Sequence, residues 1–389
     1  MKRLWSIDCL RGIAVMLVML GHSDLGELRG PLQAVEPIAL SGGTGVTLFV
    51  VISGFSIHLR WADKTAGAEP FPVAAFWRRR FVRLYPTYWA ALAVCLAMLA
   101  ITDGLDAFDR PGPFAWDGRQ PGWLVVLNHL TVIGSNVVPA QFIARSWSLA
   151  LEEQLYAGYS LLQRAGRFRP TRLVVPTAAL SIATILVAQA IGDWEPLTLP
   201  EASQGPPLWQ LIVTFQVPVL AFAWVLGAWL AEWHVGRLTL PRWFADPRVA
   251  AALLATAIGL RYVGATVGPF TPSDAVIAVL FALGYACLVA WLVDREHHRG
   301  AAPGVLAPVA RVGLWSYSVY LLHQPFFHLV EERTALAPRL AVPLGWALAL
   351  AASGLFFHVV ERHFIRRAAG RREPPGTTPP TPAPEQTRP

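Results

Sequence analysis

Residues 7–23 read IDCLRGIAVMLVMLGHS, an apolar stretch that carries an arginine and a histidine eleven positions apart. Ionisable side chains inside a membrane helix are costly, so Arg11 and His22 are candidates for function. Eleven positions are close to three helical turns, which predicts that both side chains project from one face, about 16 Å apart. Asp8, three residues before Arg11, is placed to pair with it. The alternative is that Arg11 extends to the membrane surface and His22 ends the helix there.

The rest of the chain shares this apolar character. Its 389 residues are 54% hydrophobic and only 15% charged, with a mean hydropathy of +0.44, whereas a soluble domain has about 25% charged residues. This composition predicts an all-α integral membrane protein, a multi-pass bundle of about ten transmembrane helices. The predicted segments are residues 7–23, 44–59, 85–102, 146–163, 173–192, 211–233, 249–267, 274–293, 305–330 and 340–360.

The distribution of basic residues predicts the orientation of this bundle. If ten helices alternate and the N-terminus is cytoplasmic, 23 of the 32 Lys and Arg residues fall on the cytoplasmic side and seven on the other. This bias follows the positive-inside rule and predicts that both termini are cytoplasmic, in a bacterial-type plasma membrane. It also explains the net charge of +7 without nucleic acid as a partner, and leaves membrane lipids as the expected surroundings.

Residues 1–367 are expected to form one membrane domain, followed by a disordered Pro- and Thr-rich tail at residues 368–389. The short apolar segment 123–134 is expected to be interfacial or re-entrant. Cys9, Cys95 and Cys287 lie in separate apolar segments without metal-ligand spacing, so we expect no metal site and no bound cofactor.

The densest basic cluster, Arg78, Arg79, Arg80 and Arg83, precedes the third predicted span. Such a cluster is typical of the cytoplasmic surface beside anionic lipids. Arginine side chains also bind phosphates through two parallel hydrogen bonds, which makes the cluster a candidate anchor for a phosphate-bearing ligand.

The fourth predicted span contains adjacent carboxylates, Glu152 and Glu153, which point about 100° apart on a helix and therefore have different surroundings. Glu152 lies at the depth predicted for His22, so we expect the carboxylate to contact the imidazole and fix its tautomer. The alternative is a carboxylate that pairs with an arginine for structural reasons.

The ninth predicted span carries Tyr317, Tyr320 and His323 on one face, and Pro325 is expected to kink it. Aromatic stripes in membrane helices usually serve packing, but His323 falls in the outer half and is a candidate for the cavity that holds His22. Glu361 and Arg362 are expected to form an ion pair at the end of the tenth span.

Taken together, these residues resemble the acyltransferase-3 family of integral-membrane acyltransferases. The matching pieces occur in family order over about residues 5–367. They are residues 8–12 with the Arg11 and His22 pair, 45–55 (GVTLFVVISGF), 80–86 (RFVRLYP), 147–156 (WSLALEEQLY), 316–325 (SYSVYLLHQP) and 361–364 (ERHF).

The resemblance implies transfer of an acyl group, usually acetyl, from cytoplasmic acyl-CoA as co-substrate to a hydroxyl of a glycan, another carbohydrate or a glycosylated metabolite. It implies that His22 is the catalytic histidine, that Arg11, Arg80 and Arg83 support donor binding, and that Glu152 is a core motif residue. We add Asp8 and Arg79 to the donor-binding residues. The expected cavity-lining residues are Ser53, Trp147, Ser148, Tyr317, Tyr320 and His323.

A different class of function stays open from the residues alone. Intramembrane charges also occur in transporters and flippases, although the chain shows no clear inverted repeats or paired broken helices. Incubation with labelled acetyl-CoA separates an enzyme from a transporter.

Overall fold

The fold of the chain was obtained as a computed structural model that describes residues 3–23, 36–62, 70–103, 147–191, 217–266, 274–300 and 304–369. Within these ranges the chain is helical and contains no strand. The predicted segment at 123–134 and the tail from residue 370 onward lie outside the described residues.

Each of the ten predicted segments corresponds to a helix or, in one case, to a bent pair of helices. This agreement arises because apolar length is a strong signal for a helix in a membrane, where every backbone group needs an internal partner. The helices are α1 (Trp5–Gly21), α3 (Gly45–Ala62), α4 (Val73–Asp103), α7 (Trp147–Arg164), α8 (Pro170–Ile191), α10 (Val217–His234), α11 (Pro247–Thr266), α12 (Asp274–Arg299), α13 (Ala307–Leu314) with α14 (Ser316–Arg333), and α15 (Pro338–Phe356).

Fewer of these helices qualify as spans by length and composition. Among the described residues, six are long and apolar enough to cross a membrane, or seven if the bent pair counts as one span. Helix α1 has 17 residues, at the lower limit for crossing a bilayer. The all-helical membrane fold is thus confirmed, whereas ten crossings and the cytoplasmic position of both termini stay predictions.

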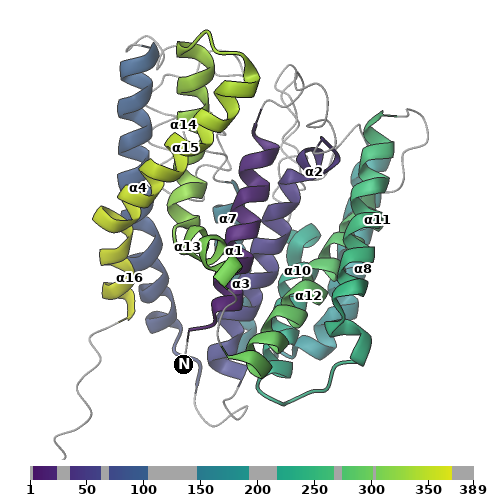
Figure 1. The fold of residues 1–389 in the computed structure, drawn as a ribbon. Coiled ribbons are helices and arrows are strands. Elements are labelled where there is room, and N and C mark those ends of the chain that lie inside the picture. Colours follow the sequence, from purple (N-terminus) through teal and green to yellow (C-terminus); the bar gives the residue numbers. More distant parts are fainter. Residues whose placement is uncertain are drawn as a thin grey trace, which may run out of the picture.

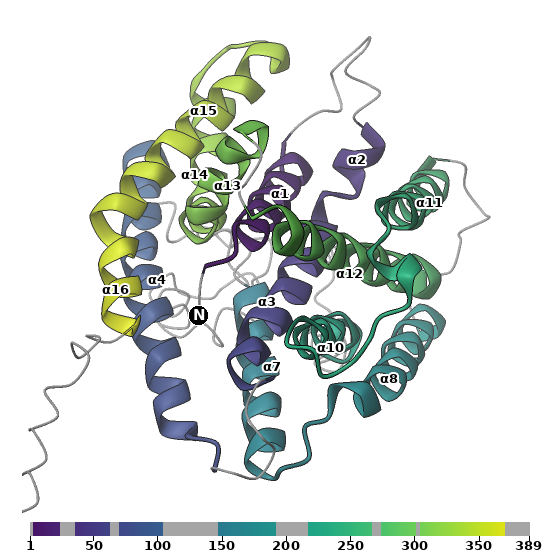
Figure 2. The same ribbon diagram turned by 60° about the horizontal axis from the view of Figure 1, so that its bottom comes forward.

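Two groups of helices flank a central pair (Figures 1 and 2). Helices α4, α14 and α15 lie on one side, and α8, α10, α11 and α12 lie on the other, with α1 and α3 between them. About 78% of the span that includes α3 is buried, against 17% for α8. Helix α3 is therefore the centre of the bundle, and α8 turns exposed apolar side chains such as Val175 and Val187 toward the lipid.

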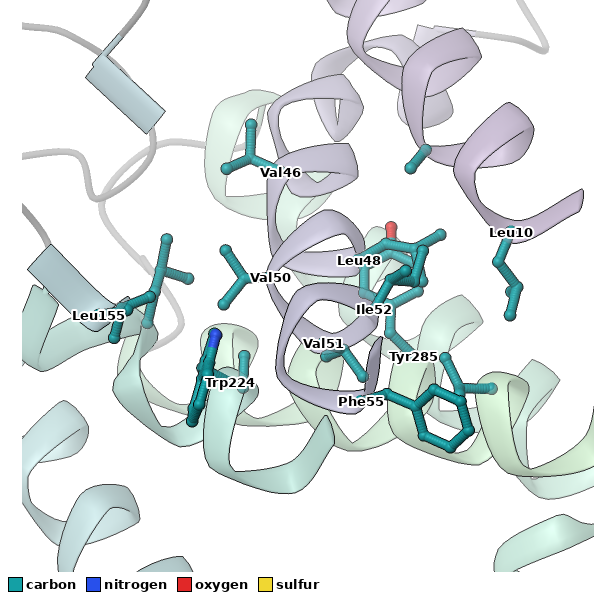
Figure 3. Close-up of a cluster of buried hydrophobic side chains, with 14 of the residues drawn as sticks. Leu10, Val46, Leu48, Val50, Val51, Ile52, Phe55, Leu155, Trp224 and Tyr285 are labelled. Atoms are coloured by element: carbon teal, nitrogen blue, oxygen red, sulfur yellow. The ribbon is translucent and has the colours of Figure 1, made fainter. Parts of the chain in front are cut away.

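Close backbone contacts place α3 at this centre. A Cβ atom on Gly54 would meet the carbonyl oxygen of Trp224 in α10, and one on Gly227 would meet that of Val51 in α3. Small residues that allow backbones to approach are typical of helix packing in membranes. Around these contacts Figure 3 shows apolar side chains on both sides of α3, with Ile52 on the side of Tyr285.

The ninth predicted span is not one continuous helix, and its sharp bend lies at Trp315 and not at Pro325. The pair α13 and α14 bends by 73° at Trp315, whereas Pro325 lies inside α14. A proline cannot donate to the carbonyl four residues before it, and Leu321 O instead accepts from the Sγ of Cys95 in α4, at 3.8 Å.

The bend at Trp315 brings α13 against α1. A Cβ atom on Gly12 would meet Val309 O, and one on Gly313 would meet Asp8 O. A straight helix over both segments would carry one of them away from this contact. The bend therefore places α13 against the half of α1 that is predicted to be cytoplasmic.

Glu296 of α12 fixes the first turn of α1. Its carboxylate accepts hydrogen bonds from Trp5 N at 3.1 Å, Ser6 N at 2.9 Å and Ser6 Oγ at 2.7 Å. The first amides of a helix have no partner within the helix, and a carboxylate there also interacts favourably with the helix dipole. This contact holds the start of α1 against α12.

The end of α15 also differs from expectation. The chain continues through a π-helical turn, η6 (Phe357–Glu361), into a further helix, α16 (Arg362–Ala369). Glu361 is buried and accepts a hydrogen bond from Ser318 Oγ in α14, while Arg362 is exposed. The two side chains point apart and do not form the expected ion pair within the described structure. The remaining short elements are α2 (Glu36–Leu40), η2 (Gly42–Thr44), η4 (Arg242–Ala245) and η5 (Gly304–Leu306).

The packing of α3 on α10 gives a test of this arrangement. We expect Gly54→Ala to destabilise the protein by about 1–3 kcal/mol, because the added methyl group meets a backbone oxygen that cannot rotate away. Thermal unfolding in detergent measures the effect. Gly158→Ala is the matched control, since a Cβ atom there has no neighbour within 4 Å; equal midpoints for the two variants would contradict the close packing of α3 on α10.

Candidate active site

A cavity of about 320 Å³ opens between α1, α3, α4, α7 and α14. It is bordered by side chains from all the sequence motifs described above except the one at residues 361–364. The lining residues are Arg11, Val46, Phe49, Val50, Ile52, Ser53, Ser56, Ile57, Arg60, Arg80, Arg83, Leu84, Ser148, Leu149, Glu152, Tyr156, Ser316, Tyr317 and Tyr320.

The cavity is strongly basic. Among its described lining residues, four arginines face one carboxylate, that of Glu152, an excess of three formal positive charges. Arg80 and Arg83 project from one face of α4 because they are three residues apart. So many like charges around one space repel one another unless an anion lies among them.

Arg80 is the most constrained of these cations. Its guanidinium carbon lies 5.2 Å from the ring centre of Phe76 and 5.1 Å from that of Tyr156. Such stacking orients the planar group and leaves its edges available for hydrogen bonding. The buried Nε has no hydrogen-bond partner among the described residues, and an unsatisfied buried donor costs about 1–3 kcal/mol.

Arg11 enters the cavity from α1 and is positioned by two contacts. Its NH1 lies 3.7 Å from Asp8 Oδ1, as the spacing predicts, and its NH2 donates to Ser56 Oγ of α3 at 3.3 Å. Asp8 also accepts from Arg3 Nε at 2.6 Å. Asp8 does not line the cavity and acts on it through Arg11.

The two adjacent glutamates face different surroundings. Glu152 lines the cavity and accepts a hydrogen bond from Ser53 Oγ, which is also 3.3 Å from the hydroxyl of Tyr156. Glu153 is buried on another side of α7 and accepts from Tyr85 at 3.1 Å. Only Glu152 is therefore placed to act in the cavity.

His22 lies at the far end of α1 from Arg11, and its hydrogen bond differs from the expected one. Its Nδ1 is 3.1 Å from Nε2 of His323 in α14, with the ring centres 5.1 Å apart. Glu152 instead bonds to Ser53. The expected contact between His22 and Glu152 is thus replaced by a pair of histidines.

Tyr320 contacts both the cavity and this histidine pair. Its ring borders the cavity and lies 6.3 Å from the ring of His323, and its hydroxyl is 2.6 Å from Ser148 Oγ. His323, which we expected to line the cavity, is buried and is not among the described lining residues, and neither is His22.

The remaining predicted residues are placed as follows. Tyr317 lines the cavity and donates to Leu84 O of α4 at 3.1 Å. Arg79 is not among the lining residues, and the side chain of Trp147 lies outside the described residues. Sequence reasoning missed Arg60 and Ser56 of α3. Both lie on the helical face that includes Ser53, so the spacing of 53, 56 and 60 was the available signal.

The structure shows no metal-binding cluster within its described residues. Cys9, Cys95 and Cys287 are buried, separate and free of disulfides. The described side chains at the site are those of arginine, glutamate, serine, tyrosine and histidine, which can bind anions and transfer protons.

Comparison with known proteins identifies the family of the chain. A family model described as an acyltransferase domain matches residues 4–358. The acyltransferase MdmB of Streptomyces mycarofaciens is 29% identical over 97% of this chain and 95% of its own length. The putative membrane-bound transacylase BcsY of Komagataeibacter xylinus is 29% identical over 82% of this chain and 72% of its own.

The chain also matches the peptidoglycan O-acetyltransferase OatA of Listeria monocytogenes over a shorter length, with 27% identity over 39% of this chain and 22% of that protein. No solved structure matches the chain. Because the family model covers nearly the whole helical bundle, including the cavity and both histidines, the chain belongs to the acyltransferase-3 family of membrane acyltransferases.

Proposed function

We propose that this acyltransferase moves an acetyl group from cytoplasmic acetyl-CoA to a hydroxyl of a carbohydrate, a cell-surface glycan or a glycosylated metabolite. The observation that carries the proposal is the basic cavity, in which the buried Nε of Arg80 lacks a partner among the described residues. An acyl-CoA donor supplies the phosphate oxygens that such a cavity favours. The bacterial cytoplasmic membrane is the proposed location, since this donor is cytoplasmic.

Arg80 and Arg83 are the proposed phosphate-binding residues, with Arg60 beside them. Arginine forms bidentate hydrogen bonds with phosphate, and each charge-assisted bond contributes about 1.5–3 kcal/mol. A ligand with several phosphates would relieve the repulsion between these cations. The acyl-bearing arm, which is longer and less charged, would then extend past Arg11 toward Ser53 and Glu152.

His22 is the proposed general base. As the acceptor hydroxyl attacks the thioester carbonyl, a C–O bond forms and the C–S bond breaks. The hydroxyl proton passes to His22, which returns a proton to the departing thiolate, so that ester and free thiol are the products. Direct transfer of this kind needs the thioester and the acceptor to meet beside His22.

The relatives support the type of reaction. OatA is named as an O-acetyltransferase of peptidoglycan, a glycan polymer with hydroxyl groups, and MdmB is named as an acyltransferase. These names favour acetyl as the acyl group and a hydroxyl as the acceptor. The alternative, a transporter without catalysis, predicts that label from acetyl-CoA never becomes covalently attached to an acceptor.

Replacing arginines of α4 with uncharged glutamine tests the proposed donor-binding residues. We expect Arg80→Gln and Arg83→Gln each to raise the KM for acetyl-CoA by about 10–100-fold, because each removes a charge-assisted bond. The kcat should change little, since phosphate binding is equal in the ground and transition states. Arg78→Gln is the matched control, as Arg78 is exposed on the same helix and outside the cavity. A similar rise in KM for Arg78→Gln would show that surface charge alone attracts the donor.

The catalytic role of His22 is tested in membranes supplied with radiolabelled acetyl-CoA and extracted glycan or metabolite acceptors. We expect His22→Ala to lower kcat by about 10²–10⁴-fold, the usual contribution of a general base. The variant should remain folded and retain its affinity for acetyl-CoA. His298→Ala, at the exposed end of α12, is the control. Full activity of His22→Ala would refute the proposed role of this residue.

A further inference from the structure

The proposed reaction uses His22 but gives no role to its neighbour. His323 is 1% exposed and lies in the middle of α14, where Tyr320 and Phe327 flank its ring. A buried imidazole is a costly choice for a position that a leucine would fill. Its hydrogen bonds indicate what it contributes.

Backbone carbonyls determine which nitrogen of His323 carries the proton. Nδ1 lies 3.0 Å from both Val319 O and Tyr320 O. Carbonyl oxygens only accept hydrogen bonds, so Nδ1 must be the protonated nitrogen. These carbonyls belong to the helix that carries His323, and their positions are fixed by it.

The second nitrogen of His323 is then an acceptor. Among the described residues, no hydrogen bond or ion pair joins His323 to a carboxylate that would stabilise a cationic ring, and an unpaired buried charge is costly. The neutral ring therefore presents the lone pair of Nε2. The atom that faces this lone pair at 3.1 Å is His22 Nδ1, which must donate its proton.

This chain of hydrogen bonds defines the tautomer of His22. With the proton on Nδ1, neutral His22 carries its basic lone pair on Nε2, on the opposite side of the ring. A histidine that acts as a base through one nitrogen commonly has the other nitrogen bonded to an orienting group. In most such sites that group is a carboxylate, whereas here it is a second histidine.

We propose that His323 is a positioning residue that holds His22 in the Nδ1–H tautomer, so that Nε2 is the nitrogen that takes the proton of the acceptor hydroxyl. The catalytic consequence rests on the proposed function, but the assignment of the tautomer does not. His323 itself neither gains nor loses a proton in the reaction. Its own Nδ1–H bond to the α14 backbone keeps it as an acceptor throughout.

Two substitutions by amide residues test the contacts of the two ring nitrogens of His323 separately. In His323→Gln the amide extends to about the position of Nε2, where its oxygen can accept from His22. In His323→Asn the amide reaches only the position of Nδ1, so it can donate to Val319 O or Tyr320 O but cannot reach His22. The pair thus keeps either the contact with His22 or the contact with the backbone.

We expect His323→Asn to lower kcat by about 10²-fold, within the range reported for loss of an orienting partner, with the KM for acetyl-CoA unchanged. His323→Gln should retain kcat within about tenfold of the wild type by the same scale. A purely structural histidine would instead give equal losses, or a greater loss for Gln. Either of those patterns would overturn the proposal.

The tautomer can be measured without any enzymatic turnover. Nitrogen-15 spectra of histidine-labelled protein in lipid nanodiscs distinguish protonated from unprotonated ring nitrogens, and loss of signals in His22→Gln assigns those of His22. We expect Nδ1–H in the wild type and in His323→Gln, and a shift toward Nε2–H in His323→Asn. An Nε2–H tautomer in the wild type would overturn the inference. If wild-type membranes transfer no labelled acetyl group, the proposed function fails, and these spectra alone decide the tautomer.

Discussion

A charged side chain inside an apolar helix bundle needs a partner from another part of the chain, and this requirement organises the structure. Glu296 of α12 satisfies the first amides of α1, Glu152 of α7 accepts from Ser53 of α3, and Glu361 accepts from Ser318 of α14. Each of these contacts joins separate segments, so the cost of burying a charge becomes a constraint on how helices meet. Arg80 departs from this pattern, because its Nε has no partner in the described residues. The cavity lies where the protein leaves this requirement to a ligand.

The helices were predictable from the sequence because the membrane requires each of them to be long and apolar. This property can be recognised in each segment without knowledge of its neighbours. The bend at Trp315 was not predictable in the same way. It depends on Gly12 and Gly313, which let α1 and α13 approach at the backbone, and that contact joins residues about 300 positions apart. Pro325 was the obvious local signal for a kink, yet the carbonyl it leaves free is satisfied by Cys95. The bend at Trp315 therefore depends on a tertiary contact and not on the local proline signal.

The candidate site was predictable in its residue types and their depth, but less so in its pairings. Spacing along one helix places Arg11 beside Asp8, and the structure shows that contact. The expected pairing of His22 with Glu152 rested on their similar depth in the membrane. Depth carries no information about how each helix is rotated around its axis. In the structure Glu152 turns toward Ser53, and His323 approaches His22 from α14. A pairing between helices needs their relative rotation, which follows from the glycine contacts and not from periodicity.

The positive charges of the cavity arginines affect how easily His22 can accept a proton, and its hydrogen-bond partner, His323, is uncharged. At about 16 Å along α1, a single charge such as that of Arg11 opposes an imidazolium at His22 by about 1 kcal/mol when the effective dielectric constant is near 20. A carboxylate beside His22 would offset this penalty but would itself have to be buried, at a cost of several kcal/mol. With His323 as the partner, this hydrogen bond itself buries no charge before the reaction begins. Under the proposed mechanism, the donor phosphates neutralise the cavity arginines when they bind, and the penalty on the imidazolium decreases at the moment when His22 must accept a proton. In this mechanism, binding of the donor and activation of the base are linked electrostatically, although His22 is not among the described residues that line the cavity.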